Sequence, residues 1–546
     1  MMDQKLTRRG FLEGSGLAAL MVVGGPALLS ACGAATSATK GSSSLRIGLL
    51  TDQDTLNVFT SVDAPELFRC VYDNLMAYDA HLNPQLQLAK TKTASADGKT
   101  LTYTLQPGAK FHDGTPVTSA DVKFSYDLVV KTGLSGAAFF IHTLVSTAAP
   151  DPGTFVATFS DPPADDPGLF VPIVPQHIWG SLAKGKIAAF TNDAMIGSGP
   201  FKFVEWKHGQ SWKIERNPDY WGTKAGLESA SWIVFQNEET LALALRQGEI
   251  DLTYPLTATI FAGLRNTSNV DAVRYQAIEF VHFGFNLSTN PKSTGNPLLR
   301  DKVIRQAMAY GTDKNKIVQL VLEGYGTPGT TVIMPAFSEW FLNIPASEQY
   351  AYNPQLANSI LDQAGYAQTS SGIRQSPGGK PLHFRLFAST VIPLLAPAAQ
   401  LLIPMMKAIG IQMDLTTMSD PSLSNQVFTL IDYDAFVWDW FSTPTPTFML
   451  SVETTGAIGT LSDTYYSNPA YDQLVALEAK TTDLKTRQQL VYEAQKIFYE
   501  DAAYIILFYL DALMAHRTDT IAGWSNVPGG IVNNNTAAGI VNLKPA

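Results

Sequence analysis

Cysteine and charge are both scarce in this chain. It holds 2 cysteines in 546 residues, and charged residues make up 16% of it, against roughly 25% in an average soluble domain. Asp and Glu (48) outnumber Lys and Arg (38), which gives a net charge of -10. A surface that binds a phosphate backbone needs the opposite balance. We therefore exclude nucleic acid as a partner.

Local catalytic and metal-binding motifs are missing too. The sequence has no His-Glu-x-x-His, Gly-x-Ser-x-Gly, Cys-x-x-Cys or Walker phosphate-loop motif. Its 8 histidines stand singly, without the spacing of a local metal site. These features predict a protein that is not an enzyme and has no cofactor or metal. A hydrolase or metal site built from distant segments is the alternative.

The N-terminus lacks an apolar run long enough to cross a bilayer. Residues 17–29 are apolar and follow Arg8 and Arg9, but about 13 residues fall short of the roughly 20 that a spanning helix needs. The segment 1–31 resembles a twin-arginine export signal. Its end, Leu29-Ser30-Ala31-Cys32, resembles the lipobox of bacterial lipoproteins.

This resemblance predicts that Cys32 is lipidated and becomes the first residue of the mature protein. Acyl chains would then hold the protein at a membrane without a spanning helix. Residues 32–44, rich in Ala, Ser, Thr and Gly, would form a flexible tether. The expected location is extracytoplasmic, on the outer face of the cell membrane or in the periplasm. Alternatively, Cys32 is an ordinary spacer residue.

The other cysteine is Cys70, in a segment that we expect to be helical. If Cys32 carries lipid, no disulfide can form. We interpret Cys70 as a buried, small apolar residue rather than a reactive thiol.

The rest of the chain has the length and composition of several globular lobes. Short apolar or alternating runs predict strands at 45–50 and 101–105, and a helix is expected over about 65–78. Asp113-Gly114 indicates a turn, and Thr118 with Asp121 resembles a capping box. His112 and Asp113 invite a catalytic interpretation, but turn and cap chemistry already explains them.

Several segments in order resemble the family-5 extracellular solute-binding proteins, which bind peptides, dipeptides, oligopeptides or nickel for ABC importers. They are the segments 111–126, 197–221, 285–286 with 296–307, and 352–366. The last one is also a helix signal, with Asn353 as cap, Pro354 in the first turn and Gly365 at the end. The likeness runs from about residue 45 to about 515.

The resemblance implies an α/β fold with mixed α+β sheets, of the two-lobed periplasmic-binding-protein type (type II, large cluster C). An extra subdomain would be inserted in the first lobe. The two lobes would close around a ligand in the cleft between them. The expected boundaries are lobe I at 45–80, 195–282 and 508–546, the inserted subdomain at 81–194, and lobe II at 283–507.

The implied function is that of the extracellular substrate-binding lipoprotein of an ABC transporter. A monomer would capture a small-molecule or peptide ligand, most simply a peptide, and deliver it to the permease and ATPase subunits. The alternatives are a metal chelate, a haem or an oligosaccharide as cargo, or a ligand receptor without transport.

Peptide-binding members of the family place an aspartate shortly after a tryptophan to hold the peptide's ammonium group. Trp438 matches the tryptophan, but Phe441 stands where the aspartate is expected, and Asp439 is only one residue on. In a strand Trp438 and Trp440 share a face, and Asp439 lies on the other. This departure puts recognition of a free amino terminus in doubt.

Two interpretations of this segment stay open. Trp438, Trp440 and Phe441 form an aromatic wall of the ligand site, or they are core aromatics. Further ligand-binding candidates lie on the loop after the first strand, near the end of the first lobe and at the crossing between lobes, and they are Asp54, Asn57, Tyr254, Phe283 and Phe285.

Overall fold

The computed structural model describes residues 42–546, apart from residues 62–64, 184, 391 and 533–534. The export signal, Cys32 and most of the expected tether lie outside the described residues. The described chain forms two compact units: unit 1 is Gln276–Asp511, and unit 2 is 42–275 with Ala512–Ala546. Two long strands, β12 (Val270–Phe285) and β19 (Tyr504–Arg517), each contribute residues to both units.

The elements of unit 2 begin with the first predicted strand, which is β1 (Ser44–Leu49). In chain order there follow α2 (Pro65–Val71), β2 (Met76–Tyr78), β3 (Pro84–Leu86), β4 (Ala89–Ala94), β5 (Thr100–Leu105), α3 (Ser119–Thr132), α4 (Ala137–Phe140), β6 (Leu144–Asp151), β7 (Thr154–Phe159), α5 (Gln176–Trp179), β8 (Phe201–Lys207), β9 (Ser211–Arg216), β10 (Ser229–Val234), α6 (Glu238–Gln247), β11 (Leu252–Thr253), α7 (Ala258–Leu264), β20 (Ile521–Ala522), α16 (Ala538–Val541) and β21 (Lys544–Pro545).

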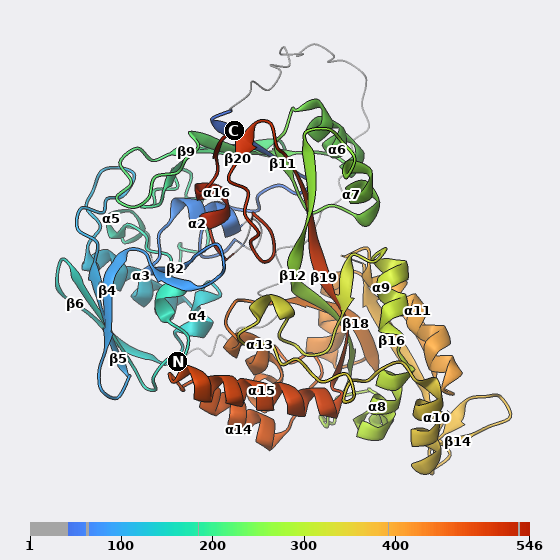
Figure 1. The fold of residues 1–546 in the computed structure, drawn as a ribbon. Helices are drawn as coiled ribbons and strands as arrows, with labels where there is room; N and C mark the ends of the chain where they lie inside the picture. The colour runs from blue at the N-terminus through green and yellow to red at the C-terminus, as the bar shows by residue number, and fades with distance from the viewer. Residues whose placement is uncertain (1–41, 62–64, 184, 391, 533–534) are drawn as a thin grey trace. The chain divides into compact units, whose positions relative to one another are not determined.

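Unit 2 contains a mixed sheet in the order β11-β1-β10-β9-β8 and a separate four-stranded sheet in the order β4-β5-β7-β6. β1 is parallel to both of its neighbours, β10 and β11, and Leu45 and Ile47 on it are fully buried. β5 shows the alternation that the sequence predicts, because Leu101, Tyr103 and Leu105 are buried and the residues between them are not. Helix α3 packs against β6 and β7 (Figure 1).

The prediction of a helix over 65–78 is wrong in its second half. Helix α2 ends at Val71, and residues 76–78 form the strand β2. The carboxylate of Asp73 is fully buried and accepts four hydrogen bonds, which hold the chain in a non-helical path after the helix. Its donors are the Gln87 amide (2.7 Å), the Tyr220 hydroxyl (2.9 Å), the Ser198 hydroxyl (3.1 Å) and the Trp221 indole N–H (3.1 Å).

The same contacts explain two of the segments on which the family resemblance rests. Ser198 lies in Gly197-Ser198-Gly199-Pro200, and Tyr220 and Trp221 end the segment 197–221. A Cβ atom on Gly197 would lie 2.0 Å from the carbonyl oxygen of Val71, so only glycine fits against the end of α2. These residues fix the path of the backbone. Their contacts do not indicate a role in ligand binding.

Unit 1 holds most of the larger helices. Its elements are α8 (Lys302–Gly311), α9 (Lys314–Val321), β13 (Gly326–Pro328), α10 (Pro354–Gln363), β14 (Ala367–Gln368), β15 (Arg374–Gln375), β16 (His383–Ser389), α11 (Leu395–Ala408), β17 (Gln412–Met418), α12 (Asp420–Ser424), β18 (Ala435–Phe441), α13 (Thr447–Val452), α14 (Pro469–Glu478) and α15 (Leu484–Asp501).

The sheet of unit 1 runs in the order β17-β16-β18-β12-β19, and β13 also pairs with β19. Helix α11 lies against β16, β17 and β18, and α14 and α15 lie side by side (Figure 1). The hydrophobic core of unit 1 is formed by side chains of these strands and of α8 and α11. Phe283, Phe285, Phe436 and Trp438 belong to it. The predicted caps of α10 are present: Asn353 accepts from the Leu356 N–H at 2.9 Å, and Gly365 has φ 83°.

The local predictions around 111–126 are also confirmed. Gly114 has φ 90°, and the Asp113 carboxylate accepts from the Thr115 N–H at 2.9 Å, as the turn requires. Helix α3 begins after Thr118, whose N–H donates to the Asp121 carboxylate at 2.9 Å. The imidazole of His112 accepts from the Gly197 N–H at 3.2 Å, and burial lowers its pKa to about 4. These contacts assign it a structural role.

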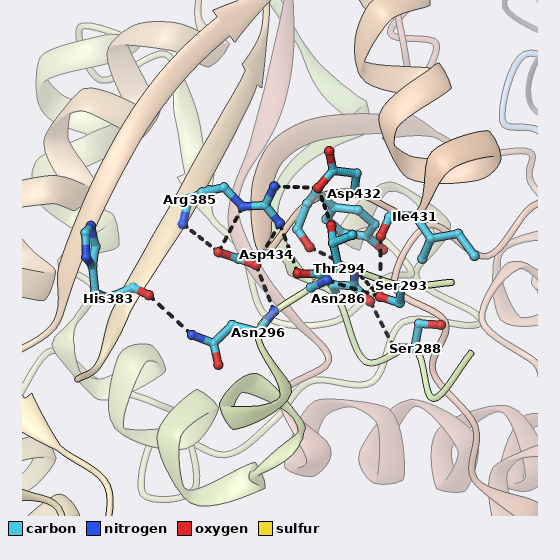
Figure 2. A network of polar contacts seen from close by, with 12 residues as sticks. Asn286, Ser288, Ser293, Thr294, Asn296, His383, Arg385, Ile431, Asp432 and Asp434 are labelled. Atoms are coloured by element: carbon cyan, nitrogen blue, oxygen red, sulfur yellow. Dashed lines mark hydrogen bonds and ion pairs between the residues drawn. The ribbon is translucent and has the colours of Figure 1, made fainter. Parts of the chain in front are cut away.

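A polar network fixes the start of β18 and the segment 286–296 (Figure 2). The buried carboxylate of Asp434 accepts from the backbone N–H groups of Asn296 and Arg385, both at 2.8 Å, and from the Arg385 guanidinium at 3.1 Å. The amide of Asn286 donates to the Tyr433 carbonyl at 2.8 Å. The matched residues Asn286 and Asn296 therefore secure a loop to the sheet.

Candidate functional site

The candidate site is the antiparallel pair of β12 and β18 in unit 1. The register places Trp440 opposite Phe280, Trp438 opposite His282, Asp439 opposite Val281 and Phe441 opposite Glu279. Directly opposed residues lie on the same face of a sheet. One face therefore carries Trp438 and Trp440, and the other carries Asp439, Phe441 and Glu279. The alternation that the sequence predicts for residues 438–441 is present.

The two tryptophans are buried inside unit 1. Trp438 is 1% exposed, and its indole N–H donates to the Asp420 carboxylate at 2.8 Å. Trp440 is 3% exposed, and its indole N–H lies 3.1 Å from an Asp463 carboxylate oxygen and 3.3 Å from the Tyr504 hydroxyl. Both indole N–H groups thus have partners within unit 1. Their role in ligand binding stays a prediction, and the contacts shown are those of core aromatics.

Behind Trp440 lies a cluster of buried carboxyl groups. Glu453 and Asp463 are 1% and 0% exposed, and the Tyr504 hydroxyl is hydrogen bonded to both. Burial, and then the charge of Asp463, raises the pKa of Glu453 well above its usual range. The Asp463 carboxylate is therefore the hydrogen-bond partner that Glu453, Tyr504 and Trp440 share or adjoin. The imidazole of His282 also lies near this cluster, 3.5 Å from an Asp463 carboxylate oxygen.

The opposite face of the pair is accessible at its Phe441 end, whereas Val281, opposite Asp439, is fully buried. Phe441 is 41% exposed, and Asp439 and Glu279 are half-buried. Removal from water, and then the charge of Asp439, raises the pKa of Glu279 to about 8. An aromatic ring and two carboxyl groups therefore share one surface of the strand pair. Such a surface suits a ligand with an apolar part and a positive charge.

Glu279 was not among the residues predicted from the sequence. No motif marks it, because it lies far from Phe441 in the chain and meets it only through the strand register. The partners of the tryptophans, Asp420 and Asp463, were missed for the same reason. The alternation in 438–441 predicted two faces but gave no sign of which one is covered.

The other predicted ligand residues are scattered over both units. Phe283 and Phe285 are fully buried in the core of unit 1, with ring centroids 4.7 Å apart. In unit 2 the fully buried Asn57 donates to the carbonyls of Ile187 (2.7 Å) and Phe190 (3.1 Å). Tyr254, also in unit 2, donates to the Glu66 carboxylate at 3.0 Å. Asp54 in the same unit is exposed and accepts from the Ser61 hydroxyl at 2.5 Å.

Cys70 is buried, as expected, and burial raises the pKa of its thiol. Across the described residues, no helix is long and apolar enough to cross a bilayer. In the same part of the chain, no group of three or more His, Cys, Asp or Glu side chains is placed to hold a metal ion.

Comparison with known proteins decides the family. The model of the bacterial extracellular solute-binding proteins, family 5 (middle), matches residues 83–458, more than half of the chain. The chain belongs to this family. Its members are solute-binding proteins and not enzymes, so the family-5 assignment confirms at that level the expectation of a binding function.

Individual relatives agree with the family over most of the chain. The oligopeptide-binding protein AppA of Bacillus subtilis is 26% identical over 483 residues, which cover 86% of this chain and 87% of AppA. The structure of B. subtilis AppA with a nonapeptide covers 93% of this chain and 99% of its own, with 24% identity and a TM-score of 0.74. NikZ of Campylobacter jejuni with Ni(L-His) covers 92% and 99%, with 21% identity and a TM-score of 0.76.

These structural matches confirm the predicted fold class, a mixed α/β fold of the periplasmic-binding-protein type. The three-part division with an inserted subdomain at 81–194 stays a prediction, as do the ligand-binding residues.

Proposed function

We propose that this protein is the substrate-binding component of an ABC importer and that its cargo is a peptide. The observation that carries the proposal is the family-5 match over residues 83–458, joined to the likeness to an oligopeptide-binding protein over 86% of the chain. The protein would capture the peptide outside the cytoplasm and deliver it to permease and ATPase subunits. Closure of the protein around cargo would be favoured because cargo binds the closed form more tightly.

The accessible face of β12 and β18 supplies the ligand chemistry in this proposal. Phe441 stands in the place of the family aspartate, and Asp439 and Glu279 lie on the same face as Phe441. We assign the positive end of the cargo to these two carboxyl groups and an apolar side chain to the Phe441 ring. Ammonium binding to a carboxylate of raised pKa requires the release of its proton.

Export and anchoring complete the proposal. Arg8 and Arg9 before the apolar stretch, and Leu29-Ser30-Ala31-Cys32 after it, support twin-arginine export followed by lipidation of Cys32. The mature protein would then act at a membrane surface, held by its acyl chains.

The cargo is tested by native mass spectrometry of the freshly purified protein, followed by incubation with a peptide library. We expect intact peptides to be retained and released unchanged. A bound nickel chelate, haem or oligosaccharide would show that the cargo is not a peptide, while the solute-binding function would stand. Cleaved peptides would contradict a binding function. Loss of peptide uptake on deletion of the gene would support transport, whereas unchanged uptake would favour a receptor without transport.

A further inference from the structure

A cavity of about 360 Å³ opens on the helical side of unit 1, between α8, α10, α15 and the segment 344–350. None of its lining residues belongs to β12 or β18, so it is distinct from the candidate cargo face. Its volume lies at the lower end of the roughly 300–1,000 Å³ that small-molecule sites occupy. It suits a molecule much smaller than an oligopeptide.

Three tyrosine rings form the wall of this cavity. The rings of Tyr310 and Tyr350 meet edge to face at 5.0 Å, and those of Tyr350 and Tyr499 lie 4.9 Å apart. Two of the three hydroxyls have partners within the protein. The Tyr350 hydroxyl donates to the Glu500 carbonyl at 3.0 Å, and the Tyr499 hydroxyl accepts from the Tyr350 N–H at 2.7 Å. The Tyr310 hydroxyl has no hydrogen-bond partner among the residues that the structure describes, and it remains able to bind a ligand.

Charges of both signs stand at the rim. Lys496 lies 3.5 Å from a Glu348 carboxylate oxygen and 3.9 Å from one of Glu500, and all three side chains are about half exposed. Exposed ion pairs at such distances contribute little stability, so a ligand can exchange them at small cost. The rim therefore offers a carboxylate for an ammonium group and an ammonium for a carboxylate, beside an aromatic wall.

We propose that this cavity is a second binding site of the protein, for a free α-amino acid with an aromatic side chain. The ring would lie against Tyr310 and Tyr350, the α-ammonium group would pair with Glu348 or Glu500, and the α-carboxylate would pair with Lys496. The zwitterion matches the rim, because one ligand satisfies both signs at once. The inference does not rest on the identity of the cargo.

The test titrates L-phenylalanine into the full-length protein, with calorimetry or saturation-transfer NMR as the readout. We expect saturable binding with a dissociation constant in the millimolar range. Lys496→Met and Glu348→Gln should each weaken it by about fivefold, the effect of one exposed ion pair. The matched controls are Lys485→Met and Glu493→Gln, which change exposed residues of α15 that do not line the cavity.

Any one of the following results would overturn the assignment of this cavity. They are the absence of saturable binding in the millimolar range, equal losses in the control variants, and binding of the uncharged N-acetyl-phenylalaninamide as tight as that of L-phenylalanine. Displacement of L-phenylalanine by a cargo peptide would do the same, because it would place the amino acid in the cargo site. Lys496→Met should retain the cargo seen by native mass spectrometry, so the two proposals fail separately.

Discussion

Replacing Trp438 by Phe removes one hydrogen-bond donor from the interior of unit 1. The Asp420 carboxylate oxygen that it serves is also bonded to the buried Ser389 hydroxyl at 3.0 Å. Loss of one donor to a buried carboxylate costs about 1–3 kcal/mol. We therefore expect Trp438→Phe to lower the free energy of unfolding by this amount, measured by urea denaturation, and to leave cargo affinity nearly unchanged.

The contrasting variant is Phe441→Ala on the accessible face. An exposed side chain contributes within about 0.5 kcal/mol to stability, so this variant should unfold like the natural protein while its cargo affinity falls. The opposite pattern, with full stability and lost affinity in Trp438→Phe, would place Trp438 in the ligand site.

If the proposed cargo face binds the ligand, Glu279 should make that binding depend on pH. Its pKa is raised to about 8 in the folded protein, so the ligand-free protein holds this proton at pH 6 to 7. A cationic ligand binds the ionised form, and its affinity should rise with pH by up to about tenfold per unit below that pKa. Stability changes in the opposite sense, because a raised carboxyl pKa favours folding at low pH and this contribution is lost between about 4.5 and 8.

Calorimetry of the cargo peptide at pH 6 and pH 7 checks this dependence on pH. These values lie below the pKa of a peptide amino terminus, about 7.7–8.0, so the ligand keeps its charge. Glu279→Gln should bind equally at both values. Affinity that is independent of pH in the natural protein would remove Glu279 from the site.

At the scale of the element, Asp434 holds the residues before β18 in place through hydrogen bonds to two backbone N–H groups. Asp434→Ala leaves the N–H groups of Asn296 and Arg385 without an acceptor, and we expect it to lower the free energy of unfolding by about 3 kcal/mol. Asp432→Ala is the matched control, because Asp432 pairs with the same arginine but its side chain is 39% exposed. It should cost less than about 1 kcal/mol. Equal losses in urea denaturation would contradict this assignment.

Elements with local signals could be predicted from the sequence. The caps of α10, the turn at Asp113-Gly114 and the alternation of β5 depend on neighbours within a few residues, and all three are present. The end of α2 could not be predicted, because Asp73 is fixed by partners as far away as Ser198 and Trp221. A local sequence pattern does not predict contacts between segments so far apart in the chain.

The candidate site also has some features that local sequence predicts and others that depend on distant contacts. Strand periodicity separates Trp438 and Trp440 from Asp439 and Phe441 before any coordinates are known. Which pair is covered depends on Asp420 and Asp463, and the addition of Glu279 depends on the register with β12. The departure at Phe441 from the aspartate that the family resemblance implies is visible in the sequence, whereas the position of Glu279 opposite Phe441 is not.

At the scale of the whole molecule, the proposed export signal and lipid anchor would set where the protein acts. Cys32→Ala removes the thiol that would accept the lipid, and Arg8→Lys with Arg9→Lys removes the pair that resembles the export signal. We expect the first variant to leave the membrane fraction yet remain outside the cytoplasm, and the second to accumulate inside the cell. Cell fractionation with labelling by a radioactive fatty acid measures both. Because about 0.8 kcal/mol accompanies each buried methylene group, loss of the acyl chains should release the protein almost completely, and labelled Cys32→Ala protein in the membrane would refute the anchor.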